Sequence, residues 1–104
     1  MVGISGLRRV LVMTIERRRI IFEGWVQGVG FRMTARRLSS AYPILGYVRN
    51  RDDGRVELVV EGEPEILSSY LRALHHEFGD MIRDIHEESE PSGGESLAGF
   101  TIRY

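Results

Sequence analysis

Apolar residues recur along this chain at two different spacings, one typical of strands and one typical of helices. Together these spacings predict alternating strands and helices. Short apolar runs typical of strands occupy residues 18–23, 44–50, 55–61, 81–85 and 100–104. Apolar residues recur at helical spacing in residues 31–42 and 64–78. Pro43 ends the first of these helices and Gly79 ends the second. Residues 87–96 are acidic and contain a proline and two glycines, so they predict an exposed loop.

The order of these elements, β-α-β-β-α-β with one further strand, predicts an α+β fold of the ferredoxin-like type. Each βαβ unit crosses over right-handed and leaves a gap between its two parallel strands. The two units interleave, so we expect an antiparallel sheet with both helices on one face and an extra C-terminal strand. Residues 52–54, Asp-Asp-Gly, are typical of a hairpin turn between the second and third strands. We expect this domain to cover residues 17–104 and residues 1–16 to be a flexible N-terminal extension, with Met13 as an alternative start site.

The composition fits one globular domain and excludes several kinds of site. A chain of 104 residues, 42% hydrophobic and 28% charged, is long enough for a single core. Cysteine is absent, which excludes disulfides, thiolate metal ligands and a thiol nucleophile. This absence fits a reducing compartment, and we expect a cytoplasmic location. No run of about 18 apolar residues is present to span a membrane.

The charge balance argues against a polyanionic partner. Fourteen basic residues, all of them arginine, stand against fifteen acidic ones, so the net charge is −1 and no global field attracts nucleic acid or a membrane surface. Three histidines do not suggest a metal site, because His75 and His76 are neighbours that point in different directions on a helix, and no third ligand has suitable spacing. We expect a monomer with no metal, nucleic-acid or membrane partner.

A glycine-rich segment, residues 24–30, joins the first predicted strand to the first helix and is the best candidate for chemistry. Glycines let successive backbone N–H groups turn inward, and the helix start adds free N–H groups. Arg32 stands in the first helical turn, where a cation is unfavourable unless it binds an anion. The segment therefore predicts an anion site, or else Arg32 is a surface arginine in an arginine-rich chain. We expect Trp25 to pack beside this loop, and the alternative is that it covers the loop.

The predicted topology brings Asn50 to the same end of the sheet. The strands that precede the glycine-rich segment and Asn50 are parallel, with one strand between them, so the two backbones should lie about 10 Å apart. The segment is not a phosphate-binding Walker A loop, because no Gly-Lys-Ser/Thr follows, and it lacks the third glycine of the dinucleotide motif. We expect no cofactor. An RNA-binding module of the same sheet order is disfavoured, because residues 55–61 contain no aromatic residue and carry carboxylates.

Residues 24–32, GWVQGVGFR, resemble the acylphosphatase signature G-x-V-Q-G-V-x-F-R. Residues 45–50, LGYVRN, resemble the second motif of that family, G-[WYF]-V-x-N. The run DGRVE followed by EG matches a third stretch, and FTIRY is similar to the usual C-terminus, so the resemblance covers residues 18–104. Two departures are Tyr47, where tryptophan is commoner, and Arg51, where a small or apolar residue often stands.

The resemblance implies a hydrolase that cleaves the carboxyl–phosphate bond of small acyl phosphates, giving a carboxylate and inorganic phosphate, which would also inhibit. It implies two catalytic residues: Arg32 would bind the phosphoryl oxygens with loop N–H groups, and Asn50 would orient the attacking water. The implied phosphate-binding loop comprises Gln27, Gly28, Val29, Gly30, Phe31 and Arg32. The resemblance implies neither a metal nor a phosphoenzyme.

Two alternatives stay open at this point. The chain could be a non-catalytic small-anion-binding module of ferredoxin-like fold, although this leaves Asn50 without a role. It also resembles the acylphosphatase-like segment of the hydrogenase-maturation carbamoyltransferase, which is usually followed by cysteine-rich zinc motifs that this sequence does not contain.

Overall fold

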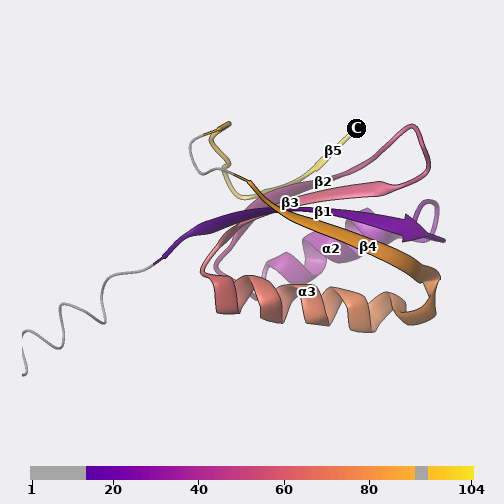
Figure 1. The fold of residues 1–104 in the computed structure, drawn as a ribbon, viewed down its shortest axis with the longest axis horizontal. Coiled ribbons are helices and arrows are strands. Elements are labelled where there is room, and N and C mark those ends of the chain that lie inside the picture. Colours follow the sequence, from indigo (N-terminus) through magenta and orange to yellow (C-terminus); the bar gives the residue numbers. More distant parts are fainter. Residues whose placement is uncertain (1–13, 91–93) are drawn as a thin grey trace, which may run out of the picture.

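The computed structural model describes residues 14–90 and 94–104, and it contains one sheet with both helices on the same face (Figure 1). The elements in chain order are β1 (Glu16–Gly24), α2 (Phe31–Ser39), β2 (Leu45–Asn50), β3 (Val56–Gly62), α3 (Pro64–Phe78), the 3₁₀ turn η1 (Gly79–Met81), β4 (Ile82–Glu90) and β5 (Phe100–Arg103). The ferredoxin-like α+β prediction is confirmed. β1 begins at Glu16, and residues 1–13 of the predicted extension lie outside the described residues.

The strand order is β4-β1-β3-β2-β5, which places one strand between β1 and β2 as predicted. β1 and β2 both pair antiparallel with β3, so they run in the same direction and end at the same edge of the sheet. The last strand is different: β5 pairs parallel with β2, so the sheet is mixed rather than wholly antiparallel. The reason is that β4 ends where β1 and β2 begin, and a strand that starts from that end must run in their direction.

The prediction of a loop over residues 87–96 is wrong for residues 87–90, because β4 continues to Glu90. The acidic residues of this segment lie opposite the arginines of β1, and charge pairing across strands favours the extended ladder. Arg19 Nε lies 2.6 Å from Glu90 Oε1, and Arg18 Nη1 lies 3.4 Å from Glu87 Oε1. The middle of the predicted loop, residues 91–93, lies outside the described residues.

The core lies between the sheet and the two helices. Its buried members come from strands β1–β4, from both helices and from two connecting segments: Ile20, Phe22, Val26, Phe31, Ala35, Ile44, Val48, Val56, Leu58, Val60, Leu67, Tyr70, Leu74 and Ile82. α2 ends at Ser39, three residues before the predicted Tyr42, but tight backbone bonds continue the turn and Tyr42 still packs against this core. The Tyr70 hydroxyl donates a hydrogen bond of 2.7 Å to the Ala35 carbonyl and so ties α3 to α2. No helix within the described ranges is long and apolar enough to cross a membrane.

Candidate active site

Two glycines give the loop between β1 and α2 its shape. Gly28 and Gly30 have φ angles of 78° and 79°, in the left-handed region that other L-residues seldom adopt. Gly30 is the N-cap of α2, and its carbonyl accepts the first helical hydrogen bond, from the Thr34 N–H at 3.0 Å. No side chain caps this helix, and its first turn contains no acidic residue. The loop and the first turn therefore present backbone N–H groups and a partial positive charge to an anion.

The two ends of this loop are anchored in the core. Val26 and Phe31 are fully buried, and the Phe31 ring packs against Phe22 and Phe78 with centroid distances of 4.9 and 4.6 Å. Val29, in the middle, is half-buried. Anchoring at both ends keeps the backbone between them in a defined shape, which a preorganised anion site requires.

Gln27 holds the loop against the hairpin between β2 and β3. Its side-chain Nε2 donates to the Arg51 carbonyl at 2.8 Å and to the Arg55 carbonyl at 2.9 Å. Both N–H groups of this amide are thus engaged within the protein, and the residue acts as a tether inside the predicted phosphate loop. Because Arg51 follows Asn50 directly, this contact places the loop beside the end of β2.

Asn50 is the last residue of β2 and carries an unusual polar atom. Its Oδ1 is buried and has no hydrogen-bond partner among the described residues. Buried acceptors are nearly always paired, since leaving one unpaired costs about 1–3 kcal/mol. An unpaired carboxamide oxygen beside this glycine-rich loop is suited to accept a hydrogen bond from a water or ligand.

Arg32 is the second residue of α2 and keeps its guanidinium available. Most arginines of residues 14–90 and 94–104 lie within 4.0 Å of a carboxylate, whereas Arg32 has no such partner there. Its Cζ lies 4.9 Å from the centroid of the Tyr104 ring. An unpaired guanidinium at a helix N-terminus provides the bidentate donor that a phosphoryl group requires.

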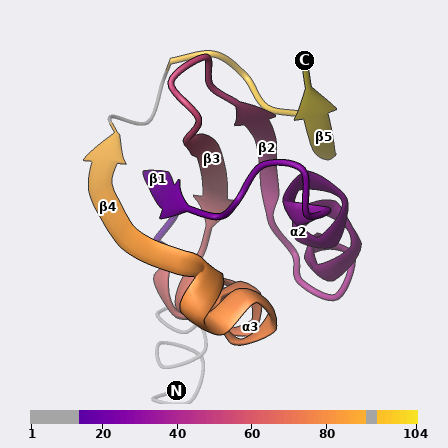
Figure 2. The ribbon, with the colours of Figure 1, turned by 90° about the vertical axis from the view of Figure 1, so that its right-hand side faces the viewer.

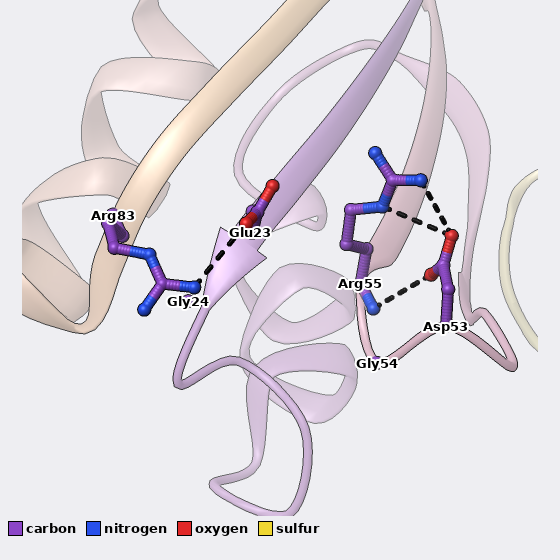
Figure 3. A pocket seen from close by; sticks show the side chains of 6 residues that line it. All are labelled: Glu23, Gly24, Asp53, Gly54, Arg55 and Arg83. Carbon is purple, nitrogen blue, oxygen red and sulfur yellow. Dashed lines mark hydrogen bonds and ion pairs between the residues drawn. The ribbon is translucent and has the colours of Figure 1, made fainter.

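Beside the loop lies a hollow of about 360 Å³ whose charges are paired with one another (Figure 3). Arg55 contacts Asp53 at 2.7 Å, and Arg83 contacts Glu23 at 3.4 Å. The hydrogen bonds from Arg55 hold the pKa of Asp53 below its ordinary value. Arg51 also contacts Asp53, at 3.2 Å, so the hairpin carboxylate restrains this extra cation next to Asn50.

Trp25, which we expected to pack beside this loop, has a largely exposed side chain. Its side chain is 68% exposed, while its backbone N–H donates to the Met81 carbonyl at 2.8 Å. That bond fixes the start of the loop without requiring the indole ring, so the side chain is left at the surface. No group of three His, Asp or Glu side chains that could hold a metal ion occurs in the part of the chain that the structure describes.

Comparisons with known proteins bear on the family of this chain. The sequence model of the Acylphosphatase family matches residues 18–102. The acylphosphatase of Caldivirga maquilingensis is 38% identical over 89 residues, which are 85% of this chain and 94% of the relative. The crystal structure of the acylphosphatase from Bacillus subtilis aligns with a TM-score of 0.76 and 35% identity, covering 88% of this chain and 100% of that one.

A second solved structure has the same fold within a longer chain. Full-length HypF in its phosphate- and nucleotide-bound form aligns with a TM-score of 0.75 and 27% identity, over 89% of this chain but 12% of that one. Taken with the fold and the two motifs at one edge of the sheet, these findings assign the chain to a class. It belongs to the acylphosphatase family, and the prediction that it is an enzyme of this family, acting on acyl phosphates, is confirmed.

Proposed function

We propose that this chain hydrolyses small acyl phosphates by direct attack of a water held by Asn50 on a phosphoryl group bound by Arg32 and the loop of residues 27–32. The observation that carries the proposal is the buried, unpaired Oδ1 of Asn50 next to a loop that presents backbone N–H groups. A purely structural asparagine would satisfy this oxygen within the protein. The family's substrates are acyl phosphates, and nothing in the site selects one acyl group.

The phosphoryl group is bound by the donors at the start of α2. Phosphoryl transfer passes through a loose transition state with charge spread over three equatorial oxygens. Loop N–H groups and the planar fork of Arg32 stabilise this charge without reorganising during the reaction. The same donors bind the inorganic phosphate product, which therefore inhibits competitively.

Asn50 positions the attacking water and does not act as a general base. Its Oδ1 accepts a hydrogen bond from the water and directs a lone pair of that water at phosphorus. The new bond forms between the water oxygen and phosphorus, while the bond between phosphorus and the carboxyl oxygen breaks. The carboxylate leaves with the bonding electrons, and the water's proton passes to a phosphoryl oxygen. No metal or covalent intermediate takes part in this step.

The test uses benzoyl phosphate hydrolysis together with binding of inorganic phosphate. Asn50→Ala removes the water-positioning oxygen and should lower kcat by about 10²–10³-fold, while the inhibition constant of phosphate changes little. Arg32→Ala should lose both turnover and phosphate binding, and Arg32→Lys should fail similarly because an ammonium does not reproduce the planar fork. EDTA should have no effect.

Two outcomes would contradict the proposal. If Asn50→Ala weakens phosphate binding but leaves kcat intact, Asn50 is a binding residue and not a water-positioning one. If the wild-type chain binds phosphate without turnover, the non-catalytic anion-binding module is the correct function. The proposal also includes a cytoplasmic, monomeric protein, in keeping with the absence of cysteine; size-exclusion chromatography tests the oligomeric state.

A further inference from the structure

The end of β5 brings an aromatic ring to the guanidinium of Arg32. Side chains alternate along a strand: Phe100 and Ile102 face the core, while Arg103 lies on the opposite face against the ring of Tyr47. Tyr104 follows next and is therefore directed to the helix side, where α2 begins. Its ring centroid lies 4.9 Å from Arg32 Cζ, within the 6 Å range of a cation–π contact.

We propose that Tyr104 is a positioning residue for Arg32, so that the parallel fifth strand forms part of the phosphate site. This inference rests on the proposed function of Arg32. A carboxylate partner would hold the guanidinium in place but would also occupy its N–H groups and neutralise its charge. An aromatic ring attracts the cation through its face and takes none of the in-plane donors, which stay available for a phosphoryl group.

Burial does not explain the position of this ring. Tyr104 is 97% exposed, so an apolar contact with the core does not hold it. Contacts on the outer face of the sheet instead hold β5, the strand that precedes Tyr104. Arg103 Cζ lies 3.8 Å from the Tyr47 ring centroid, and the Arg103 guanidinium forms an ion pair with Glu95. The Tyr47 hydroxyl donates at 3.1 Å to Glu57. These contacts fix the end of β5, and the ring of Tyr104 in turn limits the positions open to Arg32.

The test compares Tyr104→Leu with Tyr104→Phe. An exposed cation–π contact accounts for roughly a two- to fivefold change in affinity. Tyr104→Leu should therefore weaken binding of inorganic phosphate, measured by calorimetry, by about that factor. It should raise KM for benzoyl phosphate similarly and change kcat less. Tyr104→Phe keeps the ring and should match the wild type.

Thr101→Ala is the matched control for strand stability. Thr101 is exposed on the same strand and alternates to the sheet face opposite Phe100 and Ile102, so this substitution should lower Tm slightly and leave phosphate affinity unchanged. The inference is overturned if Thr101→Ala weakens phosphate binding as much as Tyr104→Leu does, or if Tyr104→Phe loses as much as Tyr104→Leu.

The failure of this inference differs from the failure of the proposed function. If Tyr104→Leu binds phosphate like the wild type while Arg32→Ala does not, Arg32 retains its role and the positioning role of Tyr104 is refuted. If the wild-type chain itself does not bind inorganic phosphate, the proposed function fails and this inference fails with it.

Discussion

Two side-chain amides near the site show how one functional group serves two purposes. Gln27 donates both N–H groups to main-chain carbonyls and so fixes the loop to the hairpin. Asn50 keeps a buried carbonyl oxygen without a partner among the described residues. The difference is one of hydrogen-bond satisfaction, since a satisfied amide stabilises structure while an unsatisfied one is available for a ligand.

The Gln27 tether leads to a prediction about loop order. Gln27→Met keeps the size of the side chain but removes both donors, and it should lower the free energy of unfolding by about 1–2 kcal/mol and raise KM for benzoyl phosphate. Gln27→Glu should be worse, because a carboxylate would face two carbonyl oxygens. Urea denaturation and initial-rate kinetics measure the two effects. A Gln27→Glu protein as stable as the wild type would contradict the tether.

At this scale the sequence predicted that the loop lies beside the end of β2, but not which atoms each side chain contacts. The glycines of the segment around Gln27 predicted the shape of this loop, and Gly28 and Gly30 do adopt left-handed φ angles. That the amide turns back to the carbonyls of Arg51 and Arg55 could not be inferred, because the contact joins segments more than twenty residues apart. The exposure of the Trp25 side chain could not be inferred either, because a large apolar residue at a turn is buried only if a neighbouring element covers it.

At the scale of elements, β3 carries a buried carboxylate on the sheet face opposite the helices. The Glu57 side chain is 3% exposed and lies 3.1 Å from Arg49 and 3.5 Å from Arg19. Burial alone raises the pKa of Glu57, but the hydrogen bonds and charge of Arg49, with Tyr47 and Arg19, hold the pKa below its ordinary value. Burial next to Glu57 raises the pKa of Tyr47. The outer face thus combines this charged cluster with the buried apolar side chains of Ile21 and Val59.

This cluster predicts an acid-dependent loss of stability. Because the pKa of Glu57 is lower in the folded state, its stabilising contribution is complete above the unfolded value of 4.5 and disappears as the pH falls through the lower folded value. Glu57→Gln should cost roughly 1–3 kcal/mol near pH 7. The difference in the free energy of unfolding between Glu57→Gln and the wild type should become smaller below pH 4.5. Thermal unfolding of both proteins from pH 7 to 3 measures this difference in stability. A difference that stays constant over this range would contradict the prediction.

The elements that differed from expectation are those defined by pairing. β4 runs to Glu90 because its acidic residues meet the arginines of β1, whereas taken alone the segment has the composition of a loop. β5 pairs parallel with β2 because of where β4 ends. The helices and the inner strands have an apolar pattern in their own sequence, so they could be predicted without knowing which segments pair.

On the scale of the whole molecule, interleaving of the two βαβ units places the loop and Asn50 at one edge of the sheet, although they lie about twenty residues apart in sequence. Figure 2 looks along the strands and shows the loop after β1 crossing this edge to reach α2. The net charge of −1 adds no overall attraction for an anion, so recognition depends on local donors.

The residues assigned to the site all lie within 24–104, which predicts that the first twelve residues are dispensable for catalysis. A chain that begins at Met13 should retain the kcat and KM of the full-length chain for benzoyl phosphate. Parallel assays of the two purified proteins test this prediction, with Asn50→Ala as the inactive reference. A tenfold loss of kcat on truncation would place a functional group in the extension.

The two outermost strands also affect how copies of this protein meet one another in concentrated solution. β4 exposes Asp84, Glu87 and Glu88 along its length, and β5 offers only four residues for pairing. A second molecule that added its own β4 in register would bring these negative charges together, so intermolecular strand addition is opposed at neutral pH.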